Sequence, residues 1–143
     1  MKPNRVPSGT RQFPGTDRRI VVVGGTDPEI VCTLIRLAPP DLYRIEQAVD
    51  GFEVCQMLRW FDVALVVVEV GLIKGDAKLR RCLERRIRLG VPVVVTAREH
   101  SPVDEVLARQ LGCVLYAPMP VGFGLMHQAV TDLLCVPAGR RVT

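Results

Sequence analysis

The sequence predicts an α/β domain in which a doubly wound, five-stranded parallel sheet lies between two layers of helices, a three-layer sandwich. Short apolar runs alternate along the chain with segments of helical periodicity. The apolar run 62–71 is continuous and rich in valine, which is typical of a parallel strand buried on both faces. Five strand–helix units with right-handed crossovers place helices on both faces of such a sheet.

Length and composition predict one soluble domain with short tails. The chain has 143 residues, of which 48% are hydrophobic and 24% charged. Proline, glycine and scattered arginine without periodicity predict a flexible tail over 1–18 and a second tail over 137–143, leaving a folded domain at 19–136. Since no apolar run approaches the roughly 20 residues of a membrane span, and none near the N-terminus is typical of a signal peptide, we expect a cytoplasmic protein with no membrane partner.

The first strand is expected at 20–23, closed by Gly24, Gly25 and Thr26. Asp27 can cap a helix that has Pro28 at its first position and stops at 39–40. The side chains expected at helical spacing on that helix are Ile30, Leu34, Ile35 and Leu37.

The second strand, at 43–48, alternates in polarity and is therefore expected at an edge of the sheet. A helix follows from 51 to about 60, with Val54, Met57 and Leu58 facing inward. The third strand is the run 62–71, which carries Glu69 at its carboxyl end. Ligands of open parallel sheets bind at that edge, so Glu69 is a candidate site residue.

The second half repeats the pattern. A helix at 76–89 carries the stripe Leu79, Leu83 and Ile87, and Gly90 ends it. Strands are expected at 91–97 and 114–117, and helices at 102–111 and 121–134, with Gly112 ending the former. The five cysteines are Cys32, Cys55, Cys82, Cys113 and Cys135. Their scattered apolar contexts predict buried free thiols, neither disulfides nor metal ligands.

Three segments, in order and at matching spacing, carry a resemblance to a known family. They are 46–54, a strand followed by an acidic-glycine turn; 91–97, a strand ending in a hydroxyl and a small residue; and 111–120, a strand with an aromatic residue and a final proline. Over residues 19–135 the chain resembles the receiver domain of bacterial two-component response regulators. The resemblance implies a flavodoxin-like fold and a role in signal transduction.

The resemblance also implies which positions would carry chemistry. The family transfers a phosphoryl group to an aspartate at the end of the third strand, with Mg²⁺ held by that aspartate and an acidic pair after the first strand. A lysine after the fifth strand and a hydroxyl after the fourth contact the phosphoryl oxygens.

This chain departs from that pattern at most positions. The acidic pair falls on Gly24 and Gly25, or on Gly25 and Thr26, and Asp27 is the nearest carboxylate. The acceptor position holds Glu69 and the lysine position holds Met119, whereas the hydroxyl and the aromatic are kept. The expected degenerate pocket comprises Gly24, Gly25, Asp27, Glu69, Thr96, Tyr116 and Met119. We therefore expect a pseudo-receiver that is not phosphorylated, with no metal and no cofactor. Phosphorylation on an unusual residue remains an alternative.

Glu69 has two interpretations. It could imitate a phosphorylated aspartate, but imitation by charge needs the missing lysine. The favoured interpretation is a partly solvated carboxylate that accepts a hydrogen bond from Thr96 or a nearby backbone N–H, because burying an unpaired charge is costly. Thr96 and Tyr116 could form a two-state switch, although structural roles are favoured for both. His100 and His127 are too isolated for a metal or catalytic pair, and His100 is expected in solvent, so an enzyme is not expected.

The leading functional hypothesis is protein–protein contact with a signalling protein or with a second copy of the chain. In the family the docking face comprises the fourth helix, fifth strand and fifth helix, here about 102–134. Candidate partner-binding residues are Val106, Leu115, Val121, Phe123, Met126 and Val130.

The alternative is binding of nucleic acid or another polyanion through the basic segment 74–88. Seven basic residues stand there against two acidic ones. The candidates are Arg80, Arg81, Arg85 and Arg88. No aromatic residues are interleaved to stack bases, which disfavours nucleic acid, and a solvated outer face would explain the charges equally well.

Overall fold

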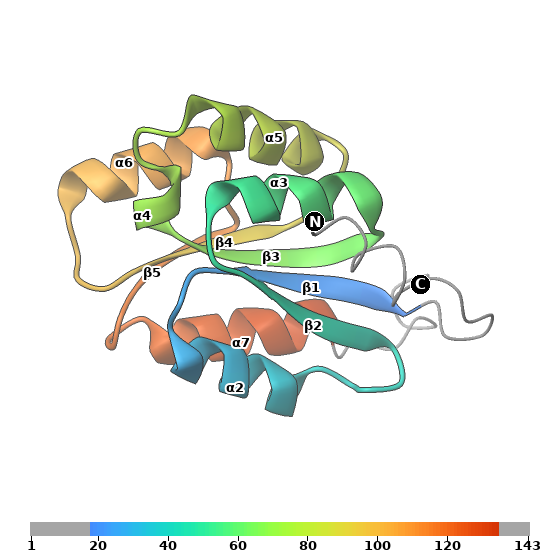
Figure 1. Ribbon diagram of the computed structural model, residues 1–143. Coiled ribbons are helices and arrows are strands. Elements are labelled where there is room, and N and C mark those ends of the chain that lie inside the picture. Colours follow the sequence, from blue (N-terminus) through green and yellow to red (C-terminus); the bar gives the residue numbers. More distant parts are fainter. Residues whose placement is uncertain (1–17, 135–143) are drawn as a thin grey trace.

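The computed structural model describes residues 18–134 and contains one parallel sheet with the strand order β2-β1-β3-β4-β5 (Figure 1). The strands are β1 (Arg19–Gly24), β2 (Tyr43–Ala48), β3 (Val63–Glu69), β4 (Val93–Ala97) and β5 (Leu115–Pro118). Every pairing is parallel, so each connection crosses over the sheet. This confirms the doubly wound fold and the position of β2 at an edge.

Helices cover both faces of the sheet, as Figure 1 shows, with α2 and α7 below it and the others above. The helices are α2 (Pro28–Leu37), α3 (Gly51–Trp60), α4 (Val70–Ile73), α5 (Ala77–Arg88), α6 (Pro102–Leu111) and α7 (Phe123–Leu134). None of the helices within residues 18–134 has the length and apolarity that crossing a membrane requires.

Two apolar cores, one on each face, hold the layers together. β3 lies in the middle of the sheet, and its residues Val63 to Val68 are all buried. Alternate side chains of β3 point to opposite faces of the sheet. Leu65 and Val67 join the core between the sheet and helices α2 and α7, while Val66 and Val68 join the core between the sheet and helices α3, α5 and α6. The unbroken valine run is therefore required by burial on both faces.

Short polar side chains begin the helices where the sequence predicts them. Asp27 accepts a hydrogen bond from the Glu29 backbone N–H at 2.9 Å, and Pro28 follows it at the first helical position. Gly112 ends α6 in the left-handed conformation, with φ of 102°. The cap at Asp27 fixes the start of α2 beside the candidate site at the carboxyl edge of the sheet, whereas Gly112 fixes the end of α6 before β5.

Some expectations were wrong in detail. The sequence analysis does not anticipate α4, a single turn directly after β3, and α7 begins at Phe123 instead of 121. Ile35 is 58% exposed, and Thr33 takes a buried place on α2. At 3.6 residues per turn, Thr33 lies on the same stripe as Ile30 whereas Ile35 does not. The inward positions Val54, Met57 and Leu58 on α3 are confirmed.

The cysteine prediction needs correction. The described cysteines are free, as expected, but Cys32 is exposed on α2, and Cys55, Cys82 and Cys113 are only partly buried. Cys135, Val136 and nearly all of both expected tails lie outside the described residues. Burial, followed by the hydrogen bond with Cys82, raises the pKa of the Cys55 thiol to about 12.

These thiols should differ strongly in reactivity. Because only thiolates are alkylated rapidly, we expect iodoacetamide at about pH 8 to modify Cys32 well before Cys55. Peptide mapping by mass spectrometry over a time course measures both rates in one sample. Equal rates at the two positions would contradict the burial described here.

Candidate functional site

The candidate site lies at the carboxyl edge of the sheet, where the ends of β1, β3, β4 and β5 meet. Glu69 pairs with Thr96 across β3 and β4. The Met119 backbone N–H donates to the Ala97 carbonyl at 2.7 Å, which brings the end of β5 beside the end of β4. The fold thus gathers the residues that the sequence singled out.

Glu69 is folded against Gly25. A Cβ at position 25 would lie 2.5 Å from Glu69 Cδ, closer than real Cβ contacts. The backbone of Gly25 has φ of +141°, which side chains rarely adopt. The Gly25 N–H donates to the Ala48 carbonyl at 2.8 Å, and Gln47 Nε2 donates to the Gly25 carbonyl at 2.9 Å. The loop after β1 is therefore held in a form that only glycine fits at this position.

The carboxylate of Glu69 accepts a hydrogen bond from a backbone group. The Thr26 N–H donates to Glu69 Oε2 at 3.3 Å, and the Glu69 side chain is partly exposed. The hydroxyl of Thr96 does not take part. Thr96 is buried, and its Oγ1 has no hydrogen-bond partner among the described residues. Of the two donors expected for Glu69, the structure uses the backbone one.

Met119 occupies the position where the family resemblance would place a cation. Its side chain is half-buried and packs against the core under α2 and α7. The peptide bond between Met119 and Pro120 is cis. A thioether offers no positive charge to a phosphoryl group.

The residues present do not fit Mg²⁺, which prefers about six oxygen ligands in octahedral geometry. Glu69 is hydrogen-bonded to the Thr26 backbone, and the nearby Asp27 carboxylate caps α2. Within residues 18–134, no cluster of three or more His, Cys, Asp or Glu side chains is placed to hold a metal ion.

Comparison with known proteins finds similarity in structure only: no protein-family model and no curated protein matches the sequence. Among solved structures, a CheY-like response regulator receiver domain protein from Methanospirillum hungatei is 18% identical, with a TM-score of 0.61 over 81% of this chain and 94% of that one. The non-phosphorylated HemR receiver domain from Leptospira biflexa is 20% identical, with a TM-score of 0.61 over 84% and 98%. The chain has the receiver-domain fold.

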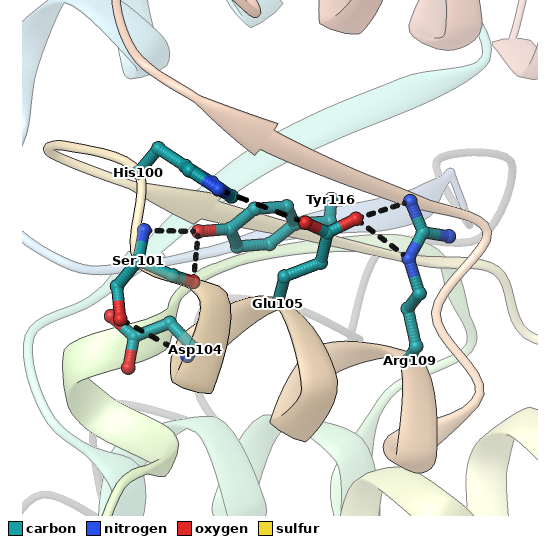
Figure 2. A network of polar contacts seen from close by, with 6 residues as sticks. All are labelled: His100, Ser101, Asp104, Glu105, Arg109 and Tyr116. Atoms are coloured by element: carbon teal, nitrogen blue, oxygen red, sulfur yellow. Dashed lines mark hydrogen bonds and ion pairs between the residues drawn. The ribbon is translucent and has the colours of Figure 1, made fainter.

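Within this receiver fold, Tyr116 ties β5 to the loop before α6 (Figure 2). The Ser101 N–H donates to Tyr116 Oη at 3.4 Å, and that hydroxyl donates to the Ser101 carbonyl at 3.5 Å. The rings of His100 and Tyr116 pack edge to face at 5.9 Å. His100 is exposed, as expected, yet it contacts Tyr116 and approaches Glu105 at 3.9 Å. Tyr116 therefore has a structural role in this fold, and its partners Ser101 and His100 could not be identified from the sequence motif.

A second contact ties the segment after β3 to α6. Lys74 Nζ lies 3.2 Å from Asp104 Oδ1, and Asp104 is buried. Ser101 Oγ also accepts from the Asp104 N–H at 3.3 Å and caps the helix. Sequence analysis missed Ser101, although a serine directly before a proline at the first helical position signals a cap. It missed the Lys74–Asp104 pair because 30 positions separate them.

The expected partner-binding residues divide between surface and core of the receiver fold. Val121 is 88% exposed and Val106 is also exposed, whereas Leu115 and Phe123 are half-buried. Met126 and Val130 are fully buried in the core under α7, so they cannot contact a partner. Sequence analysis missed the exposed Val103 on α6 and Leu125 on α7. Helical spacing could have found Val103, which lies three positions before Val106.

Three of the four polyanion candidates share one stripe of α5, because Arg81, Arg85 and Arg88 stand at positions i, i+4 and i+7. Arg85 lines a groove against α3, whereas Arg81 and Arg88 are exposed and outside that groove. Arg80 is partly buried and also lies outside the groove. Of the four candidates for polyanion binding, only Arg85 lines the groove, although Arg81 and Arg88 lie on the same stripe of α5.

The contact between Glu69 and Gly25 predicts a specific pattern of stability. Gly25→Ala should lower the free energy of unfolding by about 1–3 kcal/mol, chiefly because the positive φ strains any side chain and to a smaller extent because the new Cβ displaces the Glu69 carboxylate. Adding Glu69→Ala should recover the stability lost through the steric contact but not the stability lost through the strained backbone. Urea unfolding of the single and double variants measures both.

Gly71→Ala is the matched control. Nothing lies within 4 Å of a Cβ built at Gly71, and its backbone is helical. That substitution should not lower the free energy of unfolding and should raise it by up to about 1 kcal/mol, because alanine favours helical backbone over glycine. A Gly25→Ala variant as stable as Gly71→Ala would contradict the geometry.

Proposed function

We propose that this chain is a pseudo-receiver that acts in signal transduction by protein–protein contact, without a phosphorylation cycle and without being an enzyme. The observation that supports this most directly is the Glu69 side chain lying against Gly25. A carboxylate cannot stand at position 25 while Glu69 keeps this place, so the acidic partner that a metal would need is missing.

Electrostatics supports the same proposal. Phosphoryl transfer relies on cations to offset charge on the phosphoryl oxygens in the transition state. At this edge the lysine position holds the thioether of Met119, and the nearest basic residue after β3, Lys74, is paired with Asp104. A dianion on residue 69 would have neither a metal nor a free ammonium group to stabilise it.

The contacts of α6 favour a module with one resting conformation. Tyr116 is buried and bonded to Ser101, and Lys74 is paired with Asp104, so two separate contacts hold the start of this helix. A conformational switch needs a ligand that binds its two states with different free energy. With no phosphoryl group to supply that difference, partner binding depends on the shape already present.

The face of α6, β5 and α7 is the proposed docking surface. Its exposed apolar side chains are Val103, Val106, Val121 and Leu125, with Leu115 and Phe123 half-buried among them. Burying exposed apolar side chains against a partner is favourable roughly in proportion to the area removed from water. The occupant would be a signalling protein or a second copy of the chain.

Phosphorylation can be tested directly. After incubation of the purified chain with Mg²⁺ and acetyl phosphate, intact-mass spectrometry should show the unmodified mass alone. A response-regulator receiver that accepts a phosphoryl group from acetyl phosphate is run in parallel, and its mass increase confirms that the donor is active. A mass increase of one phosphoryl group on this chain, at residue 69 or elsewhere, would refute the proposal.

The docking surface can be tested by substitution. Leu125→Asp should reduce capture of a native partner from an extract of the source cell by about tenfold or more, because a charge is buried at an apolar contact. Leu42→Asp is the matched control, since Leu42 is equally exposed but precedes β2 at the opposite edge of the sheet. If both variants capture the partner as well as the unaltered chain does, the partner binds elsewhere.

A further inference from the structure

A groove of about 280 Å³ lies between α3 and α5, and none of the candidate-site residues described above lines it. The two helices lie side by side above the sheet in Figure 1. The side chains that matter most in its wall are Phe52, Arg59, Lys78, Arg85 and Arg86, with Asp76 as the acidic member. Neither the loss of the phosphoryl site nor the α6–β5–α7 face accounts for this groove.

The walls of the groove carry excess positive charge. Four cationic side chains line it against the single carboxylate of Asp76. That carboxylate is already engaged, because Asp76 Oδ1 accepts from the Leu79 N–H at 2.9 Å. Asp76 Oδ2 also packs against Gly51, because a Cβ built at Gly51 would lie 2.5 Å from this oxygen. None of the four cations in the wall appears in an ion pair of the described chain.

The remaining lining of the groove is neutral and includes apolar surface. Leu58, Cys55 and Cys82 contribute to it, and at neutral pH the Cys55 thiol is protonated because burial raises its pKa to about 12. Phe52, which also lines the groove, is 65% exposed. An aromatic side chain beside several arginines is the composition found at the centres of protein interfaces.

We propose that this groove binds an acidic segment of a partner protein, one that carries apolar side chains between its carboxylates. Arginine guanidinium groups bind carboxylates in a bidentate geometry, and the apolar lining and Phe52 would accept a leucine or phenylalanine. Nucleic acid fits less well. The apolar lining offers phosphates nothing, and Phe52 is the single aromatic side chain among the described residues that line the groove, so successive bases would have no stacking platform.

A designed peptide can test the groove without knowledge of the natural partner. The probe is a fluorescein-labelled peptide of Glu and Leu at helical spacing, compared with a Glu-only peptide of equal length and with a single-stranded DNA. Fluorescence anisotropy at low salt should show saturable one-to-one binding of the Glu/Leu peptide, weaker binding of the Glu-only peptide and the weakest binding of the DNA.

Two variants with the same change in net charge locate the site. Lys78→Glu with Arg85→Glu, both in the groove wall, should weaken binding of the Glu/Leu peptide by about tenfold or more. Arg36→Glu with Arg98→Glu, which change exposed residues on α2 and after β4 that do not line the groove, should weaken it by less than about threefold. Circular dichroism establishes that both variants fold.

Phe52→Ala provides a second test that does not alter charge. Because Phe52 is exposed, this variant should fold, and it should weaken binding of the Glu/Leu peptide but not of the Glu-only peptide. The proposal is overturned if the unaltered chain shows no saturable binding of the Glu/Leu peptide. It is also overturned if the two charge variants lose binding equally, or if DNA binds more tightly than the peptide.

Discussion

The site depends on the contact between the Glu69 side chain and the bare backbone of Gly25. Because residue 25 has no Cβ, the longer glutamate side chain can fold over the loop after β1 and accept a hydrogen bond from the Thr26 N–H. A partly exposed carboxylate with a backbone hydrogen-bond donor avoids the cost of burying an unpaired polar group. The contact thus satisfies Glu69 locally and leaves no room for a second carboxylate.

Polar contacts at the same edge of the sheet join the elements around the site. Tyr116 is hydrogen-bonded to the backbone of Ser101, and Asp104 is paired with Lys74, which connects β5, α6 and the segment after β3. One buried hydroxyl, that of Thr96, is left without a partner among the described residues, directly beside Glu69 in the sheet. An unsatisfied hydroxyl costs about 1–3 kcal/mol, and it marks the place where this edge is least well satisfied.

The fold could be predicted from the sequence because it depends on local signals. The valine run of β3 and the cap at Asp27 each specify their element without reference to distant residues. The site could be predicted only in part. The order of motifs predicts that Gly25, Glu69 and Met119 lie at the carboxyl ends of β1, β3 and β5. The packing of Glu69 on Gly25 depends on side-chain conformation in three dimensions, which the sequence order does not give.

Helical periodicity alone also could not predict which apolar side chains of α7 are buried. Met126 and Val130 lie on the stripe that faces the sheet, while Leu125 lies beside it and is exposed. An apolar residue in an amphipathic helix serves either the core or a surface, and only the docked position of the helix decides which. For the same reason the run of basic residues on α5 does not tell which of them line the groove against α3, as Lys78, Arg85 and Arg86 do.

The most direct test of the central claim is a calorimetric titration of Mg²⁺ into the purified chain. If Glu69 is satisfied by the loop after β1 and no other carboxylate faces it, the titration should show no saturable heat up to about 10 mM Mg²⁺, well above the range in which a site with several carboxylates would fill. Saturable one-to-one binding that is lost in Glu69→Ala would contradict the account, because it would show that this edge of the sheet still assembles a metal site.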